Sequence, residues 1–344
     1  MTADKGHIWL GEISEGEQIN GCYLVKDKRV GTTRTGNPFI SITLADRSGD
    51  MEAKVWDRAR EYAPLFDQGD LVEVAGITES FRGQVQMNVS RLSVSDRDMD
   101  PGVFMESTPG NVSEMVTALK DILKAVEDRH LKTLCDRFLM DRKFMEMFTQ
   151  APAAKNFHHG YLGGLLEHTL SVCTMAQRVL ELYDRLDRDL LLSGAFLHDI
   201  GKVRELSWNG RIDYTDEGRL LGHVTIGAAM VDAKIIGIKG FPDPLALRLK
   251  HLILSHHGQY DFGSPKRPKF LEAFALHLVD DLDAKMNGLG RIMDKDPREG
   301  AWTDYNRMFE RYLLKGRMAS SEEPSEGEIQ EADAQATLFA PRKE

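Results

Sequence analysis

The apolar residues of this chain follow two different periods, and the change of period divides the chain. Up to about residue 96, apolar and polar residues alternate, as in Phe39–Leu44 and Gln84–Val89, and turn-forming Gly and Asp residues separate the runs. Period two is typical of half-buried β-strands. From about Val112 to Leu314, apolar residues recur every three or four positions, which is typical of helices. Because the 344 residues exceed the roughly 250–300 at which a single core stops growing, we expect separate β and helical domains.

The first domain is predicted to be a small barrel. The alternating runs give five strands, the first over Gln18–Lys28, with a short helical stretch at Arg58–Phe66 between the third and fourth. This order is that of the OB-fold, a Greek-key barrel. A segment rich in turn formers follows it, and the end of the chain is rich in Glu, Ser and Ala. The predicted boundaries are barrel 1–97, linker 98–111, all-α bundle 112–317 with a core at about 155–290, and a disordered acidic tail 318–344.

The charge of the chain is unevenly distributed. There are 44 basic and 54 acidic residues, which gives a formal net charge of −10. Half of this excess lies between Met318 and Glu344, where seven acids face two bases. The rest is only mildly acidic, and because a local basic face is sufficient, the charge does not exclude a nucleic-acid partner.

Cysteine usage and the N-terminus indicate a cytoplasmic protein. Cys22, Cys135 and Cys173 are odd in number and far apart, so they are predicted to be reduced core residues. The first residues lack a secretory signal, and no apolar run is long enough to cross a bilayer. We therefore expect no membrane partner.

The histidines are concentrated in the helical domain. Of eleven histidines, nine lie between His158 and His277. Several stand with Asp residues at the ends of apolar helical runs, namely His168, His198-Asp199, His223, His256-His257 and Asp280. Imidazole and carboxylate together suit first-row transition metals, and an adjacent His-Asp pair can offer one carboxylate to two ions. The pattern predicts a metal site at the centre of the bundle.

This ordered set resembles the HD-domain metal-dependent phosphohydrolases. Within them, the block FHHGYLGGLLEHT at residues 157–169 is similar to that of the YhaM-like 3′→5′ exoribonucleases, which also carry an OB-fold before the HD domain. The resemblance implies an HD-domain bundle in which His168, His198, Asp199 and Asp280 hold a first metal. It also implies that Asp199 bridges to a second ion held by His223, His256 and His257. Mn²⁺ is the expected ion, with Co²⁺, Fe²⁺, Zn²⁺ and Mg²⁺ as alternatives.

The second site and its surroundings leave alternatives open. One of His256 and His257 could contact phosphate instead of a metal. Lys202 follows the His-Asp pair at a spacing that lets its ammonium reach a metal-bound phosphate, so Asp199 and Lys202 are the predicted catalytic residues. His158 and His159 are predicted to contact the substrate.

The barrel is predicted to bind single-stranded nucleic acid. If the alternate apolar residues fill it, Phe39, Lys54 and Trp56 point outward on the face where OB-folds stack bases. Two loops add further predicted contacts, which are Lys28, Arg29 and Arg34 in the first and Phe81 and Arg82 in the last. Aromatics interleaved with cations suit single strands without sequence preference. The alternative is that Trp56 packs against the Arg58–Phe66 helix.

Three functions remain after these arguments. The favoured one is a 3′→5′ exonuclease that degrades single-stranded nucleic acid to 5′-mononucleotides by attack of metal-activated water, with RNA favoured over DNA. The alternatives are an HD-type hydrolase of small nucleotides and an OB-fold adaptor with a structural HD domain. In the tail, Gln335–Phe339 resembles the short peptide by which bacterial DNA-processing proteins dock on the sliding clamp. The sequence also leaves open whether the chain forms an oligomer.

Overall fold

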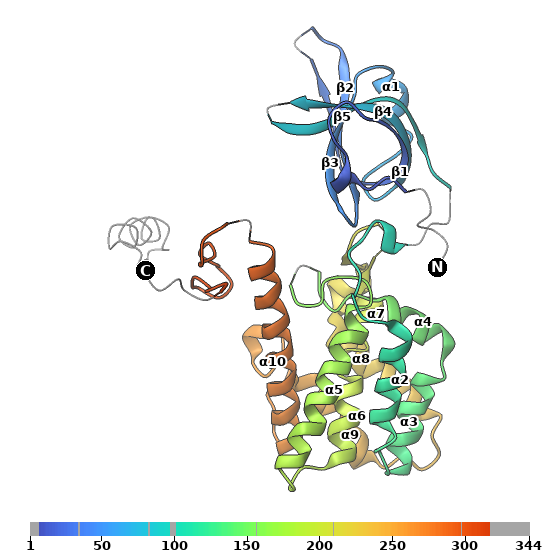
Figure 1. The fold of residues 1–344 in the computed structure, drawn as a ribbon. Coiled ribbons are helices and arrows are strands. Elements are labelled where there is room, and N and C mark those ends of the chain that lie inside the picture. The colour runs from blue at the N-terminus through green and yellow to red at the C-terminus, as the bar shows by residue number, and fades with distance from the viewer. Residues whose placement is uncertain are drawn as a thin grey trace, which may run out of the picture. The chain divides into compact units, whose positions relative to one another are not determined.

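The fold is that of a computed structural model, which describes residues 7–33, 35–81, 83–96, 101–155, 157–208, 210–296 and 298–316. The chain divides into two compact units after Asn287. Figure 1 shows the barrel strands and, further along the chain, the helical bundle. The predicted tail, with its clamp-like peptide Gln335–Phe339, lies outside the described residues.

The five N-terminal strands form a closed barrel in the order β1-β2-β3-β5-β4. Only β3 and β5 pair in parallel, and the other neighbours are antiparallel. This arrangement confirms the predicted OB-fold class. The strands are β1 Gln18–Thr32, β2 Pro38–Asp46, β3 Gly49–Val55, β4 Leu71–Phe81 and β5 Gln84–Val94.

Two predicted bounds in the barrel are wrong. The first strand continues beyond Lys28 to Thr32, because its second half pairs with β2 through Val30 and Ile40. The helix between β3 and β4 is the single turn α1, Ala59–Tyr62, rather than Arg58–Phe66. Arg58 has a left-handed backbone (φ 56°), so the helix begins after it.

The predicted alternation does fill the barrel. Ile40, Ile42 and Leu44 of β2 and Ala53 and Val55 of β3 have no exposed surface. The residues between them therefore lie on the outer surface of the sheet. Part of the predicted linker is ordered against the barrel, where Val103 and Phe104 pack with three buried residues of β1 and β2, which are Cys22, Leu24 and Ala45.

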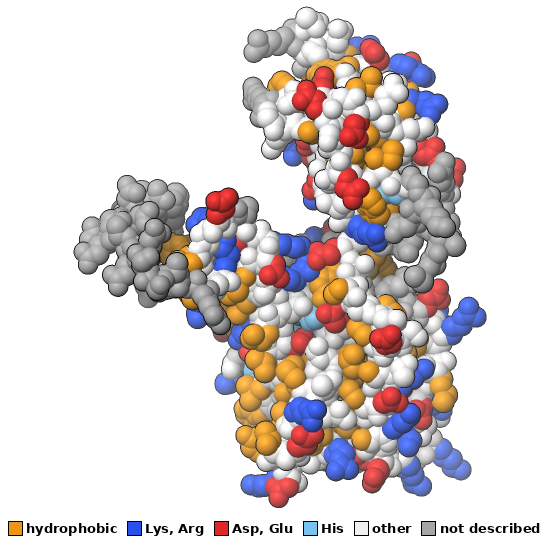
Figure 2. Space-filling view, in the orientation of Figure 1, with side chains coloured by type: hydrophobic (Ala, Val, Ile, Leu, Met, Phe, Trp, Pro, Cys, Tyr) orange, Lys and Arg blue, Asp and Glu red, His pale blue; other side chains and the backbone are white. Residues whose placement is uncertain are grey.

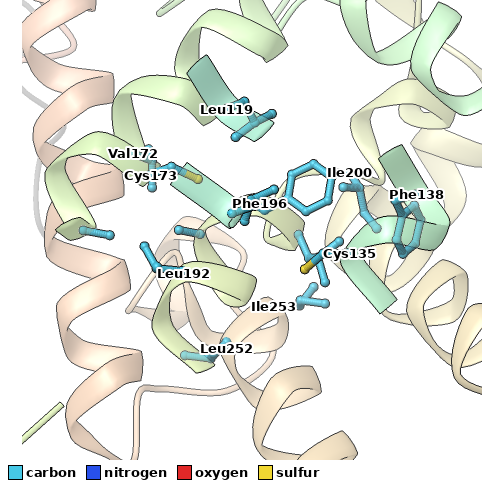
Figure 3. Packing of buried hydrophobic residues seen from close by; sticks show 14 of the residues in the cluster. Leu119, Cys135, Phe138, Val172, Cys173, Leu192, Phe196, Ile200, Leu252 and Ile253 are labelled. Carbon is cyan, nitrogen blue, oxygen red and sulfur yellow. The ribbon is translucent and has the colours of Figure 1, made fainter. Parts of the chain in front are cut away.

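The described residues from Val112 to Asp294 form a helical bundle around α6. Every residue from Leu190 to Leu197 in α6 is buried, and Phe196 and Leu192 lie among side chains of α2, α3 and α9 (Figure 3). The elements are α2 Val112–Leu123, α3 Arg129–Leu139, α4 Arg142–Gln150, α5 Gly164–Leu182, α6 Arg188–Leu197, α7 Lys202–Glu205, β6 Leu206–Ser207, β7 Asp213–Tyr214, α8 Asp216–Ile236, α9 Asp243–Ser255 and α10 Leu271–Asp294, with short 3₁₀ turns η1 Leu10–Glu12, η2 Pro101–Val103 and η3 Tyr260–Phe262.

Helix is predicted as far as Leu314, but the last helix ends at Asp294. After it the described residues form turns and isolated bridges, such as the one between Trp302 and Leu314. The sequence signal for this stop is Pro297 followed by Gly300, because both disfavour the interior of a helix. The apolar spacing in this segment therefore does not correspond to a helix.

The α10 helix exposes a stripe of large apolar side chains, which gather over this helix in Figure 2. They are Leu271, Phe274, Leu278, Leu282 and Met286. No helix among the described residues is both long enough and apolar enough to cross a membrane.

Candidate metal centre

Five helices and the residues that directly follow them bring the predicted metal ligands together. His198 and Asp199 directly follow α6, His256 and His257 directly follow α9, and His223 comes just after a kink in α8 at Gly222. The other two, His168 of α5 and Asp280 of α10, lie within their helices.

A glycine allows the turn after Asp199 to approach α8 closely. A Cβ added at Gly201 would lie 2.0 Å from the carbonyl oxygen of His223. Any larger residue would therefore push α8 and its histidine away from the rest of the centre.

The donor atoms form two clusters. In the first, Nε2 of His168 lies 3.2 Å from Nε2 of His198 and 3.1 Å from Oδ1 of Asp280. In the second, Nε2 of His223 lies 3.2 Å from Nε2 of His257, and His256 completes the group. The ligand atoms of each cluster lie within 4.8 Å of one another, which is close enough to share one ion.

The Asp199 carboxylate lies between the two clusters. Its Oδ2 is 3.4 Å from Nε2 of both His168 and His198. Its Oδ1 is 3.4 Å from Nε2 of His223 and 3.6 Å from that of His256. Since each oxygen faces a different cluster, the geometry suits a carboxylate that bridges two ions.

All five imidazoles are held by hydrogen bonds from Nδ1. His198, His256 and His257 donate to the carbonyl oxygens of Ala195, Ile253 and Phe262 at 2.7–2.8 Å. His168 and His223 instead donate to carboxylates, which belong to Asp283 at 2.7 Å and Glu205 at 2.9 Å. An acceptor at Nδ1 places the proton there and leaves the Nε2 lone pair directed into the centre.

Two buried atoms in the centre indicate which kind of ligand it suits. Oδ1 of Asp199 and Nε2 of His256 have no hydrogen-bond partner among the described residues. An unsatisfied buried polar atom costs about 1–3 kcal/mol, and a cation between these two atoms would remove the cost at both. The partial negative charge at the C-terminal ends of α6 and α9 also favours a cation here. The residues present therefore fit divalent transition metals.

Without an ion, the two clusters differ in charge. In the first, burial opposes protonation of His198, but Asp199 outweighs it and raises the pKa of His198 to about 9. In the second, burial and the neighbouring His257 lower the pKa of His256 well below its usual value. The carboxylates of the first cluster therefore favour the protonated form of His198, whereas the surroundings of His256 in the second cluster disfavour it.

Lys202 contacts the bridging carboxylate. Its side chain is nearly buried, and its Nζ lies 2.6 Å from Oδ2 of Asp199. Although burial opposes the charged form, this contact raises the pKa of Lys202. The ammonium is thus present at the centre, where sequence reasoning places it.

The two adjacent histidines of the 157–169 block have different surroundings. His159 is only 2% exposed, and its ring bonds with Oδ2 of Asp283 and with the hydroxyl of Tyr161, both at 2.9 Å. The His158 ring centroid is 5.5 Å from that of His168, and its buried Nδ1 has no partner among the described residues. Of the pair, His158 is the one with an atom left for a substrate.

Sequence reasoning missed Asp283 and Glu205, the carboxylates that hold ligand histidines. Asp283 follows Asp280 by three residues on α10, so the two share one face of the helix. That spacing is a signal that could have identified Asp283. Glu205 carries a weaker signal, because its link to His223 depends on how α7 packs against α8.

The predicted nucleic-acid contacts on the barrel differ in their exposure and in their partners. The ring centroids of Phe39 and Trp56 lie 5.1 Å apart, and Trp56 is 44% exposed, so the two rings form a pair with solvent-accessible surface. Phe81 and Arg29 are also exposed, whereas Lys54 contacts Ser41.

One basic residue differs from the prediction, and two cannot be compared. The ammonium of Lys28 donates to the carbonyl oxygens of Ala63 and Phe66, and its side chain is 10% exposed. It therefore stabilises the loop after α1 instead of facing solvent. Arg34 and Arg82 lie outside the described residues.

Known families match both domains of the chain. Residues 165–285 match the HD domain, and residues 24–94 match an OB-fold nucleic acid binding domain. Three curated relatives are each named 3′-5′ exoribonuclease YhaM. The one from Geobacillus sp. (strain WCH70) is 34% identical and covers 89% of this chain and 97% of its own. Those from Bacillus subtilis and Oceanobacillus iheyensis are each 36% identical, covering 86% and 81% of this chain and 93% and 88% of their own.

Proposed function

This chain belongs to the YhaM family of 3′-5′ exoribonucleases, and from that premise we propose that it is a metal-dependent 3′→5′ exonuclease. Its substrate is single-stranded RNA, and its products are 5′-mononucleotides. The observation that carries the proposal is the position of Asp199, whose two oxygens face two separate clusters of metal-type ligands.

Each of the two clusters would hold one divalent ion. His168, His198 and Asp280 would bind one, His223, His256 and His257 the other, and Asp199 both. When bound, two such ions supply an activated water and stabilise the attacking and leaving oxygens of a phosphate ester. Mn²⁺ is our choice of ion, with Co²⁺, Fe²⁺, Zn²⁺ and Mg²⁺ as alternatives.

The other residues of the centre bind and orient the phosphate. Lys202 has its ammonium 2.6 Å from Asp199, so it can contact a phosphate oxygen while it stays paired with the carboxylate. His158 adds an unpartnered nitrogen on the side of His168. Both stabilise the negative charge that grows on the phosphoryl oxygens during the reaction.

The chemistry of attack explains the products. Water that attacks the last phosphodiester from the side opposite the 3′ oxygen breaks the P–O3′ bond. The phosphate then stays on the 5′ oxygen of the released nucleotide, and the shortened chain keeps a 3′ hydroxyl for the next cycle. The product of each step is therefore a 5′-mononucleotide.

The barrel supports the choice of a polymeric substrate. Phe39 and Trp56 present paired rings on its surface, and such rings stack bases at about 1–3 kcal/mol each. A hydrolase of small nucleotides would have no use for this surface. The completeness of the ligand set argues equally against an adaptor with a merely structural helical domain.

One assay tests the proposal against both alternatives. Purified protein with Mn²⁺ receives 5′-labelled single-stranded RNA, the same RNA with a 3′-phosphate, the matching DNA, and free nucleotides. We expect the free-ended RNA to shorten stepwise while 5′-mononucleotides appear and the blocked RNA persists. Hydrolysis of free nucleotides alone, or binding without cleavage, would instead favour one of the alternatives.

Some expectations stay predictions. We propose a cytoplasmic location, which the three free, buried cysteines support. Docking of Gln335–Phe339 on a sliding clamp and formation of an oligomer also stay predictions.

A further inference from the structure

The loop that joins α9 to α10, residues 258–270, is fixed against the second donor cluster. The carbonyl oxygen of Phe262 accepts a hydrogen bond at 2.8 Å from Nδ1 of the cluster residue His257. Ser264 is buried, and its hydroxyl bonds with the carbonyl oxygens of Leu254 and Lys266 at 3.1 and 2.6 Å. Because of these bonds, the position of the loop is set by the same helix end that positions His256 and His257.

This fixed loop exposes two aromatic side chains. Tyr260 and Phe262 are 63% and 66% exposed, although both belong to the short 3₁₀ turn η3. Packing of the chain itself leaves most of their ring surface in water. Exposed rings held on a rigid backbone are suited to a ligand that offers flat apolar faces, and they lose little conformational entropy on binding it.

The same loop is positively charged. Lys266, Arg267 and Lys269 are exposed, and none of them forms an ion pair with any part of the chain that the structure describes. Asp261 is the only acid between residues 258 and 270. The positive field reaches the neighbouring helix, since burial and the charges of Lys269 and Lys266 lower the pKa of His251.

We infer that loop 258–270 is a nucleotide-binding subsite next to the metal centre. In it, Tyr260 and Phe262 stack bases close to the scissile phosphate, and the three cations hold the backbone that leads away from it. Aromatic rings combined with cations are the general means of binding single strands without sequence preference. The inference rests on the proposed nuclease function and adds a second contact region, on the catalytic domain itself, to the one predicted on the barrel.

Binding of a short oligonucleotide tests the stacking contacts. The probe is a fluorescent RNA pentanucleotide with phosphorothioate linkages, which resist hydrolysis, and its affinity for the full-length protein is measured by anisotropy. We expect Tyr260→Ala/Phe262→Ala to raise Kd at least about tenfold, because each stacked base is worth a factor of about 5 to 150 and this variant removes two rings. Tyr260→Trp/Phe262→Tyr keeps the rings and should keep the affinity. Tyr183→Ala, which removes a ring that is 61% exposed at the end of α5, is the matched control.

Salt dependence tests the cations separately. Each lost phosphate contact lowers the slope of log Kd against log salt by about 0.7 for single strands, so Lys266→Ala/Arg267→Ala/Lys269→Ala should lower it by about 2. Lys132→Ala/Arg142→Ala/Lys143→Ala removes the same charges from exposed positions on α3 and α4 and should leave the slope unchanged.

The outcomes separate this inference from the function on which it rests. If the wild-type protein shortens RNA but the two loop variants bind the probe as it does, the subsite is refuted and the nuclease stands. If the wild-type protein loads Mn²⁺ and shortens no RNA, the proposed function itself fails. A change of oligomeric state in the double aromatic variant, with unchanged Kd, would assign the rings to a protein contact and also refute the subsite. Thermal unfolding of each variant shows whether it folds.

Discussion

Removing the charge of Asp283 should weaken the first metal site selectively. Its Oδ2 accepts hydrogen bonds from Nδ1 of His168 at 2.7 Å and from Nε2 of His159 at 2.9 Å. Burial alone would raise the pKa of Asp283, but the bonds from His159 and His168 outweigh it and lower that pKa. In Asp283→Asn, the side-chain carbonyl oxygen can take the same position without the negative charge. The Nε2 of His168 then becomes a poorer donor to a metal.

The expected loss of metal affinity follows from the histidines that Asp283 contacts. Replacing a residue that hydrogen-bonds a ligand histidine typically costs about 10–100-fold in metal affinity, or about 1.4–2.8 kcal/mol. Asp283→Ala should be more severe, because it leaves two buried ring N–H groups without an acceptor. At about 1–3 kcal/mol for each group, the cost to folding is about 2–6 kcal/mol. The asparagine variant is therefore the informative one.

The assay counts ions and measures their affinity. Mn²⁺ binding is followed by isothermal titration and by metal content after dialysis, so the readout does not depend on activity. We expect Asp283→Asn to retain one ion of normal affinity and to bind the other about 10–100-fold more weakly. Glu205→Gln should have the corresponding effect on the second site through His223. Asp281→Asn changes a neighbouring carboxylate of α10 that pairs with the exposed Lys285, and it serves as the control.

Two results would refute this reasoning. Wild-type affinity at both sites in Asp283→Asn would show that the contact with His168 does not tune the ligand. Equal losses in Asp283→Asn and Asp281→Asn would mean that a general change of charge on α10, rather than the specific hydrogen bond, controls metal binding.

Three further changes test other parts of the structure. Asp199→Ala should lower RNA hydrolysis by about a thousandfold or more, since it removes the shared ligand, and metal analysis should show fewer bound ions. Gly201→Ala should lower the free energy of unfolding by about 1–3 kcal/mol and displace His223, whereas Gly290→Ala, with no atom near its Cβ, should not. Asp141→Ala should cost about 1 kcal/mol at pH 7, because Asp141 caps α4. Hydrogen bonds from Lys234 and Phe144 lower the pKa of Asp141 in the folded protein below its ordinary value of 3.8. The carboxylate therefore stabilises the fold above pH 3.8, and this stabilisation is lost as the pH falls through the lowered pKa. Over that pH range the difference between wild type and Asp141→Ala in the free energy of chemical unfolding should disappear.

The sequence predicts the barrel and the metal ligands for a shared reason. In both cases the informative residues are recognised from their position relative to one strand or one apolar helical run. Ile40, Ile42 and Leu44 identify the inner face of a strand without any knowledge of its neighbours. His198-Asp199 and His256-His257 stand directly after apolar helical runs, where side chains from several helices can meet.

The features that sequence reasoning missed depend on contacts between distant segments. Lys28 looks like a surface cation in the sequence, but the loop after α1 supplies three acceptors for it, which are the carbonyl oxygens of Ala63 and Phe66 and the carboxylate of Asp67. Nothing near Lys28 in the sequence indicates that loop. The irregular segment after Asp294 is a different case, because Pro297 and Gly300 are themselves a signal in the sequence for the end of a helix.

Within the metal centre, some ligand histidines are oriented by contacts near them in the sequence and others by contacts with distant segments. His198 and His256 are the C-caps of α6 and α9, and each donates its Nδ1 hydrogen to the carbonyl oxygen three residues earlier. Those carbonyls lack a partner within the helix, so a histidine at this position satisfies one and turns its Nε2 away from the helix. This arrangement is local, and it can be read from an apolar helix that ends in histidine. His168 and His223 are oriented by carboxylates from other helices, so their ring positions depend on the assembled bundle. The metal centre should therefore lose His168 and His223 before His198 and His256 when packing of the bundle is weakened.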